Sequence, residues 1–445
     1  MLLRIPKTLW TPFTTTLLAR RDVETAGLIL AERLATADGT VFVARELMPW
    51  PDDGYQERCI DFIRLDPLAI NRLTRRARDE GLSIITIHTH PGCDDAWFSS
   101  ADDRGDSRLM PGFQRQIPDV PHGSVVITGT VRVAARIFRK EGHFDPLRVV
   151  IVGDGLECPQ DLAASPDERY ARQRLALGEH GQRLLRSIRV GVVGLGGIGS
   201  AVAVQLLHQG VGGLVLIDGD AVETSNLSRI FGSGPDDVGL AKVDLVVRYA
   251  TRHGIDVPIV AVPHHLRGEA ELAYLRSCDV IISCVDRHRP RALMNRLSYE
   301  AVAPLIDLGT GFAVDATGRL TGDAGRVVIV GPTRPCLGCW GHLDPNALRE
   351  EDLSNDERAK LVRDGYVSGA DVPQPSVIAF NTMVAGAGVI ELLRLVTGFG
   401  GMDAPPQRLS FSFSQATVRR NALAAPQTCT ICGKHPRRGD ATAAA

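Results

Sequence analysis

Several features that would narrow the function are missing from this sequence. No run of about 18 or more apolar residues occurs, and the N-terminus lacks an apolar core followed by a small-residue cleavage site. We therefore expect a soluble, cytoplasmic protein without a membrane partner. A surplus of charge is also missing, since 50 basic and 52 acidic side chains give a net charge of −2. This balance argues against nucleic acid or an anionic membrane surface as a partner.

Lysines and paired cysteines are both few in this sequence, so their positions help to identify functional motifs. Lysine occurs only at positions 7, 140, 242, 360 and 434, so a lysine at a motif position carries weight. The nine cysteines are an odd number, and four of them stand in two C-x-x-C pairs. In a reducing compartment, such pairs indicate a metal site rather than disulfides.

The length of 445 residues is enough for two or three separately packed cores. Residues 1–155 alternate short apolar runs with one helical pattern at 68–80, which predicts an α+β domain. The predicted strands are residues 27–30, 41–43, 84–87, 125–127 and 149–152. Residues 156–166 are polar and contain proline, which is typical of a linker.

A second domain is expected over residues 167–436. A helical stretch leads into a strand from Val190, a glycine-rich turn, a helix and a second strand, which is the order of a βαβ unit. This pattern predicts an α/β, Rossmann-like parallel sheet. Residues 437–445 are small and polar, so we expect them to be disordered.

A candidate metal site lies in the first domain. His88 and His90 stand two residues apart at the end of an apolar run, so on a strand both imidazoles face the same side. Pro91 then ends the strand. Ser99 and Asp102 follow with the spacing of a helix start, where Ser99 would also cap the helix. Two histidines and one carboxylate leave the fourth position of a tetrahedral zinc open to water, as in catalytic sites.

An H-x-H pair alone is weak evidence, because two histidines at a strand end can simply be solvated. Here Glu24 lies upstream in V-E-T-A-G-L-I-L and adds a carboxylate that could act as a base. The succession of E-T-x-G-L-I-L, H-T-H-P and S-S-x-D resembles the JAMM motif of the JAB/MPN metallopeptidases, a family of deubiquitinases. The resemblance covers the first domain.

This resemblance implies a role for each of the motif residues. His88, His90 and Asp102 would bind Zn²⁺. Glu24 would take a proton from the zinc-bound water and pass it to the leaving amine, and Ser99 would donate a hydrogen bond to the developing oxyanion.

Alternatives to these assignments remain open. The interval from His90 to Asp102 is one residue longer than in the family, so Asp103 or Asp94 could be the ligand instead. Ser100 is likewise an alternative to Ser99. A non-enzymatic alternative, a JAB scaffold without metal, is disfavoured because the full ligand set is present.

A glycine-rich nucleotide loop opens the second domain. Gly194, Gly196, Gly197 and Gly199 form G-x-G-G-x-G between a strand and a helix, where backbone amides can approach phosphate. This loop alone indicates only a nucleotide. In a dehydrogenase, Asp218 at the end of the second strand would bind a ribose hydroxyl of the dinucleotide.

The residues after Asp218 argue against hydride transfer. Asn226, Arg229 and Lys242 place one amide and two cations downstream of the glycine loop, which suits a triphosphate. The run D-G-D-A-V-E-T-S-N-L-S-R followed by V-G-L-A-K resembles the signature of the ThiF/MoeB and ubiquitin-activating family. The resemblance covers residues 168–434.

This second resemblance implies ATP-dependent adenylation of the C-terminal glycine of a ubiquitin-like protein. Asp286, after the apolar run I-I-S-C-V, would bind Mg²⁺. Arg172 would reach into the ATP site of a partner subunit, making the enzyme a homodimer; the alternative is an ordinary surface charge. ATP would be bound by the four glycines together with Asp218, Asp220, Asn226, Arg229 and Lys242.

The two C-x-x-C pairs predict a second zinc site. Cys336 and Cys339, with Cys429 and Cys432, supply four thiolates that close the tetrahedron, so this zinc would be structural. Redox-active cysteines are the alternative. The site would attach the C-terminal part of the chain to its domain.

The segment 341–377 corresponds to the family's crossover loop, which usually carries the acceptor cysteine, but it contains no cysteine. We therefore do not predict a thioester on this chain, and we expect Cys284 to be a buried core thiol. The adenylate would pass to a separate conjugating enzyme or to a sulfur donor.

Together the two resemblances suggest a prokaryotic ubiquitin-like conjugation system in which one chain both cleaves after a C-terminal glycine and activates it. Two other enzymatic functions remain open. One is sulfur-carrier activation for cofactor biosynthesis, and the other is an ATP-dependent tRNA-modifying dehydratase. The lack of a basic patch weighs against the dehydratase.

Overall fold

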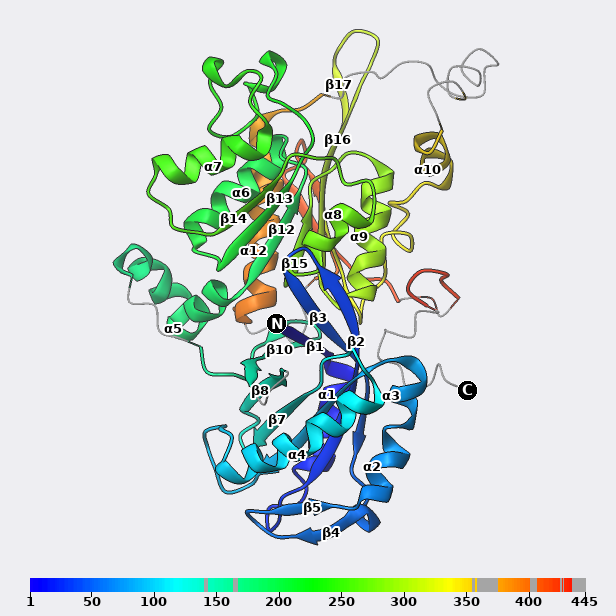
Figure 1. Cartoon of the computed structure of the whole chain (residues 1–445). Coiled ribbons are helices and arrows are strands. Elements are labelled where there is room, and N and C mark those ends of the chain that lie inside the picture. The colour runs from blue at the N-terminus through cyan, green and yellow to red at the C-terminus, as the bar shows by residue number, and fades with distance from the viewer. Residues whose placement is uncertain are drawn as a thin grey trace. The chain divides into compact units, whose positions relative to one another are not determined.

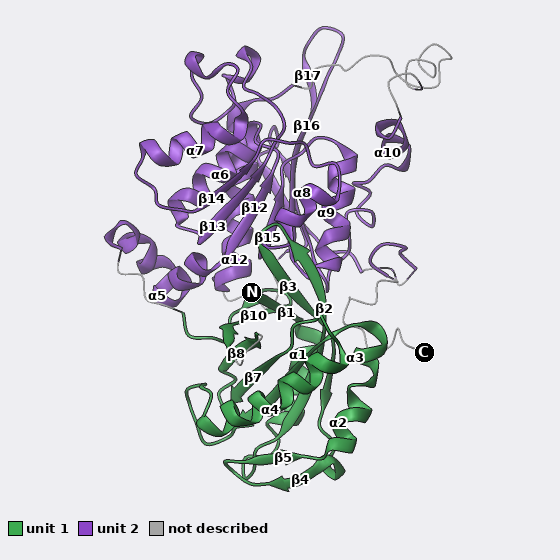
Figure 2. Ribbon diagram, viewed as in Figure 1, with its two compact units in different colours: residues 1–163, 436–445 green, residues 164–435 purple. Residues whose placement is uncertain are grey.

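The computed structural model describes residues 1–139, 143–162, 167–353, 357, 375–400, 406–424, 426 and 428–433 (Figure 1). The chain divides into two compact units, Met1–Ala163 and Ala164–His435 (Figure 2). The predicted linker 156–166 spans this boundary, and the predicted tail 437–445 lies outside the described residues.

Unit 1 is built on a nine-stranded mixed sheet with the strand order β11-β10-β1-β3-β2-β6-β7-β8-β9. A separate two-stranded sheet pairs β4 (Tyr55–Arg58) with β5 (Ile63–Leu65). The strands of the large sheet are β1 (Leu2–Pro6), β2 (Ala26–Thr36), β3 (Gly39–Pro49), β6 (Ser83–His90), β7 (Gly123–Thr128), β8 (Val133–Phe138), β9 (Phe144–Pro146), β10 (Arg148–Val152) and β11 (Leu156–Glu157).

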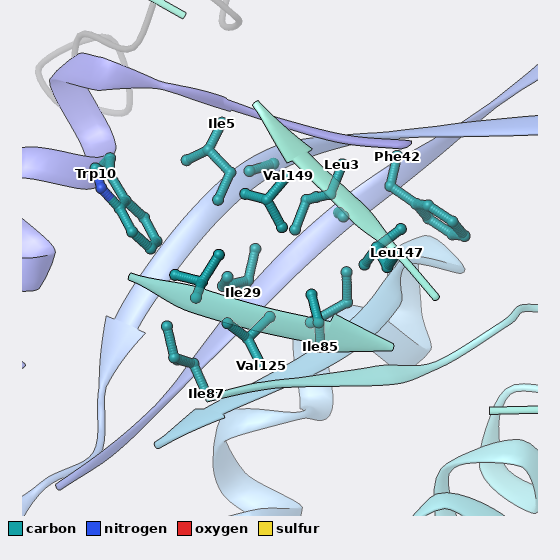
Figure 3. Close-up of a cluster of buried hydrophobic side chains, with 14 of the residues drawn as sticks. Leu3, Ile5, Trp10, Ile29, Phe42, Ile85, Ile87, Val125, Leu147 and Val149 are labelled. Atoms are coloured by element: carbon teal, nitrogen blue, oxygen red, sulfur yellow. The ribbon is translucent and has the colours of Figure 1, made fainter. Parts of the chain in front are cut away.

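Helices cover both faces of this sheet, because successive side chains of a strand point to opposite faces. Ile29 of β2 packs with Trp10 and Phe13 of α1 (Lys7–Leu17) in the cluster drawn in Figure 3. Its neighbour Leu28 packs in the cluster on the other face, which includes residues of α2 (Pro67–Leu73), α3 (Arg75–Glu80) and α4 (Ser100–Gln116). The predicted α+β fold class is confirmed.

The five predicted strands each lie within an observed strand, but the predicted helix 68–80 is divided in two. The division falls at Thr74, whose hydroxyl donates to the Ile70 carbonyl at 2.8 Å. A hydroxyl that bonds back to the preceding turn bends a helix, and the Thr74 amide still donates to the same carbonyl at 3.0 Å. The second piece ends at Gly81, which adopts a left-handed φ of 65°.

Unit 2 has an eight-stranded sheet with the order β14-β13-β12-β15-β16-β17-β18-β19. The first five strands in this order are parallel, and the last three join antiparallel. The strands are β12 (Arg189–Val193), β13 (Gly213–Ile217), β14 (Ile259–Val262), β15 (Val280–Ser283), β16 (Leu305–Val314), β17 (Leu320–Val330), β18 (Arg408–Ser412) and β19 (Thr417–Asn421).

The predicted βαβ unit consists of β12, α6 (Gly197–Gln209) and β13, whose two strands pair in parallel. The fold class is therefore confirmed for this unit too. Its other helices are α5 (Ala171–Ser187), α7 (Lys242–Arg252), α8 (Glu269–Leu275), α9 (His288–Glu300), α10 (Pro345–Glu351) and α12 (Ile378–Thr397).

Helices α12 and α5 of unit 2 differ in how they pack. α12 is long and apolar enough to cross a membrane by length and composition, yet it packs on α6 and β16, and its Glu391 is 2% exposed. These contacts are those of a core helix.

α5 is interrupted at Gly178, whose φ of 75° is not helical, and exposes Leu175 on its first part.

Candidate functional site

Three predicted zinc ligands converge at the end of β6 in unit 1. The Nε2 atoms of His88 and His90 lie 3.3 Å apart, and the Asp102 carboxylate lies 3.0 Å from His88 Nε2 and 3.5 Å from His90 Nε2. Ligands about 2.0 Å from a tetrahedral zinc are separated by about 3.3 Å. The three side chains therefore fit this ion.

Asp102 reaches the two histidines because of the local structure at the start of α4. Ser99 caps the helix: its hydroxyl accepts from the Asp102 amide at 3.2 Å, and the Asp102 carboxylate accepts from the Ser99 amide at 2.6 Å. This reciprocal pair holds Asp102 at the third helical position. The Ser99 hydroxyl proton remains available for donation.

The structure does not bring the alternative ligands to the histidines. The Asp103 carboxylate accepts a hydrogen bond from Arg136 at 2.6 Å on another side of the helix start. Asp94 is exposed, and its carbonyl accepts from Thr130. Ser100 is exposed as the first residue of α4. The geometry favours Asp102 and Ser99.

Glu24 lies beside the three ligands, just before β2. Its Oε1 is 3.7 Å from His90 Nε2, and the residue is 5% exposed. Burial raises the pKa of Glu24 to about 7, against the lowering effect of the neighbouring imidazoles. A carboxyl group with a pKa near neutrality is suited to accept and return a proton.

The sequence did not single out Trp97, which contacts the same site. Its ring centroid lies 5.6 Å from that of His90 in an edge-on arrangement, and the side chain is 52% exposed. A half-exposed indole next to a candidate metal ligand offers a flat apolar surface. Tryptophan in a loop carries no periodic signal that would have marked it.

In unit 2 the glycine loop lies between the carboxyl ends of β12 and β15. A Cβ on Gly199 would lie 1.8 Å from the Gly194 carbonyl, and Gly194 itself has a φ of 84°. Both positions therefore require glycine. The Leu195 amide donates to the Asp218 carboxylate at 2.6 Å, which ties the loop to the end of β13.

The predicted nucleotide residues gather along this edge of the sheet. Asp218 accepts from the Asp220 amide at 2.8 Å, and the Lys242 ammonium donates to the Asp220 carboxylate at 2.8 Å. Lys242 is 9% exposed, so its charge is held within the site. Three charged groups, two from the loop after β13 and one from the start of α7, are thus brought together.

Arg229 lies beside the glycine loop, and Asn226 belongs to the same segment of the chain. A Cβ on Gly197 would be 3.5 Å from the Arg229 Cβ, and the Arg229 guanidinium donates to the Ser225 carbonyl at 2.8 Å. Asn226 is 6% exposed, and its amide donates to the Ser225 hydroxyl. The loop and one candidate phosphate ligand are therefore adjacent.

Asp286 follows β15 and is exposed. Because β15 is the neighbour of β12 in the sheet, Asp286 and the glycine loop lie at the same edge, where nucleotides bind in open α/β folds. An exposed carboxylate there fits Mg²⁺, which is commonly bound by one or two carboxylates and substrate phosphates.

Arg291 and Asp307 hold the backbone after β15 that carries Asp286. Sequence patterns alone did not identify either residue. Asp307 of β16 is fully buried and accepts from Ser283 at 2.7 Å and from Arg291 Nε at 3.2 Å. The same guanidinium donates to the carbonyls of Val285 and Asp286. A buried ion pair thus holds the backbone that presents Asp286.

The four predicted thiolates also converge. Sγ–Sγ distances are 3.6 Å for Cys336–Cys339, 3.7 Å for Cys336–Cys429 and 3.5 Å for Cys339–Cys432. Sulfurs about 2.3 Å from a tetrahedral zinc are separated by about 3.8 Å. The four thiols therefore fit a structural zinc ion.

Each of the two units matches a known protein family. Residues 170–432 match the ThiF family. The chain belongs to this family. Residues 6–140 match the prokaryotic homologs of the JAB domain, so the ThiF domain is fused to an N-terminal JAB domain.

Relatives within the ThiF family have named activities. The chain is 31% identical over 282 residues to adenylyltransferase and sulfurtransferase MOCS3 of Mus musculus, a match that covers 62% of this chain and 55% of the relative. It is 28% identical over 268 residues to the sulfur carrier protein ThiS adenylyltransferase of Escherichia coli, covering 60% of this chain and 94% of that protein. The chain spans about half the length of MOCS3.

Among solved structures, Escherichia coli MccB with ATP matches at 18% identity with a TM-score of 0.47, covering 60% of this chain and 75% of that one.

Two residues of the ThiF domain differ in setting from the other predicted site residues. Arg172 is exposed on the first turn of α5 and makes no hydrogen bond or ion pair within the described part of the chain. Cys284, expected within a buried strand, lies directly after β15 and is half-buried. Burial raises the pKa of its thiol, so it is a poor nucleophile.

The predicted crossover loop falls largely on residues 354–356 and 358–374, outside the described residues.

Proposed function

We propose that this ThiF-family chain is a cytoplasmic enzyme with two activities in a prokaryotic ubiquitin-like conjugation system. Unit 2 adenylates the C-terminal glycine of a ubiquitin-like protein with ATP, and unit 1 is a zinc-dependent (iso)peptidase that cleaves after that glycine. The observation that carries the first activity is the series of hydrogen bonds that runs from the glycine loop through Asp218 and Asp220 to Lys242.

In the adenylation step, a carboxylate oxygen of the terminal glycine attacks the α-phosphorus of ATP. The P–O bond to the β-phosphate breaks, which gives an acyl-adenylate and pyrophosphate. Asp218 binds the ribose, while Asn226, Arg229 and Lys242 hold the phosphates. Asp286 would hold Mg²⁺, which when bound neutralises part of the phosphate charge.

In the peptidase, His88, His90 and Asp102 would hold the zinc, which when bound acidifies a coordinated water. Glu24 accepts the proton of the attacking water and delivers it to the leaving amine. Ser99 donates its hydroxyl proton to the developing oxyanion. The buried position of Glu24 beside His90 supports the shuttle, because it places the carboxylate next to the proposed metal ligands.

A second candidate function is sulfur-carrier activation for cofactor biosynthesis. It is favoured by two matched relatives, one named as an adenylyltransferase and sulfurtransferase and the other as a sulfur carrier protein ThiS adenylyltransferase. The lack of cysteine in 341–377 suits either case, because the adenylate would pass to a sulfur donor or to a separate conjugating enzyme. The JAB domain favours conjugation.

The assay that tests adenylation is ATP:pyrophosphate exchange by the purified protein, with glycine-tailed ubiquitin-like proteins encoded beside its gene. Exchange with the mature protein, together with zinc-dependent trimming of a form extended past the glycine, would support both activities. Exchange with a sulfur carrier alone would favour the second candidate. ATP turnover on tRNA without any exchange would replace both with the dehydratase.

Metal content tests the two zinc assignments. We expect two zinc ions per chain in the wild type and one in His88→Ala/His90→Ala, because the four thiolates form a separate site. Elemental analysis of the purified variants measures this, and Cys336→Ser/Cys339→Ser is the reciprocal control. A wild-type content of one would remove one of the assignments. The histidine variant should retain ATP:pyrophosphate exchange.

Mixed dimers test the role proposed for Arg172. Arg172→Ala and Asp286→Ala chains should each be inactive, but mixing them should restore about a quarter of wild-type exchange, since a mixed homodimer has one intact site. The control is a mixture of Lys242→Ala and Asp286→Ala, which leaves a defect in every site and should not recover. If the first mixture also stays inactive, Arg172 does not act across a dimer.

A further inference from the structure

A buried ion-pair cluster lies one helical turn beyond Asp102. Asp106 follows it by four residues, so the two side chains leave the same face of α4. Asp106 is 8% exposed, and its Oδ2 accepts from Ser124 Oγ at 2.5 Å and from Arg136 Nε and Nη2 at 3.0 and 2.7 Å. Ser124 and Arg136 are register partners on β7 and β8. The cluster therefore ties α4 to the sheet.

The same arginine holds the residues that precede Asp102 and follow it. Arg136 Nη1 donates to the Asp103 carboxylate at 2.6 Å. The guanidinium carbon lies 3.8 Å from the ring centroid of Phe98 and 4.0 Å from that of Phe144. Phe98 immediately precedes the helix cap, so one side chain fixes both the loop and the start of the helix.

The three proposed zinc ligands come from two separate elements. Contacts made by other residues must therefore fix the distance between these elements. His88 and His90 lie on β6 within the sheet, whereas Asp102 lies on α4, which is a separate element. Arg136 makes three donated hydrogen bonds to α4 carboxylates, and its side chain is 11% exposed. Without the guanidinium, Asp106 would be a buried charge left with one hydroxyl partner, which is costly.

We propose that Arg136 is a positioning residue of the zinc site: its ion pairs with Asp103 and Asp106 and its stacking on Phe98 hold Asp102 at the distance from His88 and His90 that one zinc ion requires. The inference rests on the zinc (iso)peptidase proposed above. Residues that orient metal ligands from outside typically change metal affinity by about 10- to 100-fold when they are replaced.

The test is zinc affinity, measured by competition with graded chelators on the full chain. In Arg136→Met we expect the dissociation constant of the His88/His90/Asp102 site to rise about 10- to 100-fold. The zinc held by the four cysteines serves as an internal reference and should not change. Arg139→Met is the matched control, because Arg139 is also near the end of β8 but pairs only with exposed Asp145 among the described side chains.

Two further variants keep the inference testable if Arg136→Met fails to fold. Arg136→Lys keeps the charge but cannot form the fork-shaped contacts, so its affinity should fall between wild type and Arg136→Met. Phe98→Ala removes only the stacking and should weaken zinc binding by a smaller factor. Unchanged zinc affinity in the folded variants would overturn the positioning role.

Zinc affinity also separates this inference from the proposed activity. If the wild type binds two zinc ions without cleaving any extended substrate, and Arg136→Met still loses zinc more readily, the positioning role stands while the peptidase activity fails. If the wild type binds no zinc at the His88 site, both are overturned.

Discussion

ATP:pyrophosphate exchange should fall by at least about 100-fold in Asp286→Ala. Asp286 is the exposed carboxylate at the edge where the glycine loop lies, and losing one preorganised electrostatic contact to the reacting phosphates typically costs that much. The measurement is exchange of labelled pyrophosphate into ATP at saturating ubiquitin-like protein. The fold should be unaffected, because the Asp286 side chain makes no hydrogen bond or ion pair with the described residues.

The matched control is Asp256→Ala, which removes an equally exposed carboxylate from unit 2 away from the glycine loop. It should retain wild-type exchange and the same thermal transition. A wild-type rate in Asp286→Ala would show that another group binds Mg²⁺. A loss in Asp256→Ala of similar size would show that the assay reports general damage.

Cleavage of a ubiquitin-like protein extended past its glycine should fall by about 100- to 10,000-fold in Glu24→Gln, because the amide has the shape of the carboxylate but cannot accept the proton of the attacking water. Zinc content should remain at two per chain, since Glu24 is not among the proposed ligands. The initial rate of trimming, followed by mass spectrometry, measures the effect.

Glu57→Gln serves as the control for Glu24→Gln. Glu57 is an exposed residue of β4 that pairs with Arg64 at 3.5 Å, so its variant should cleave at the wild-type rate. Trimming by zinc-loaded Glu24→Gln at the wild-type rate would exclude Glu24 as the base. Loss of zinc in this variant would instead make Glu24 a support of the metal site.

Local patterns in the sequence were enough to predict the strands and most of the residues that meet at the two candidate sites, but not elements such as β1, α1 and β8. Short apolar runs predicted β2 and β6, and the S-x-x-D spacing predicted the cap at Ser99. The helix 68–80 was predicted as one piece, because periodicity does not report that the Thr74 hydroxyl bonds back to Ile70.

Residues that act through long-range contacts could not be predicted in this way. Arg136 meets Asp106 across 30 residues, and Arg291 meets Asp307 from a different element. In the sequence, an arginine in a strand with alternating polar and apolar residues, or in a helix that contains both kinds, resembles an ordinary surface charge. Its burial and its partners appear only once strands and helices are packed.

The candidate ligand types, the glycine loop and the order of the two domains could be predicted from the sequence, because they follow from residues close together in the chain, where spacing and backbone geometry are linked. Which of several carboxylates lies beside the two histidines depends on tertiary packing. Asp94, Asp102 and Asp103 are nearly equivalent along the chain, but only Asp102 reaches His88 and His90, because the packing of α4 against the sheet sets the direction of each side chain.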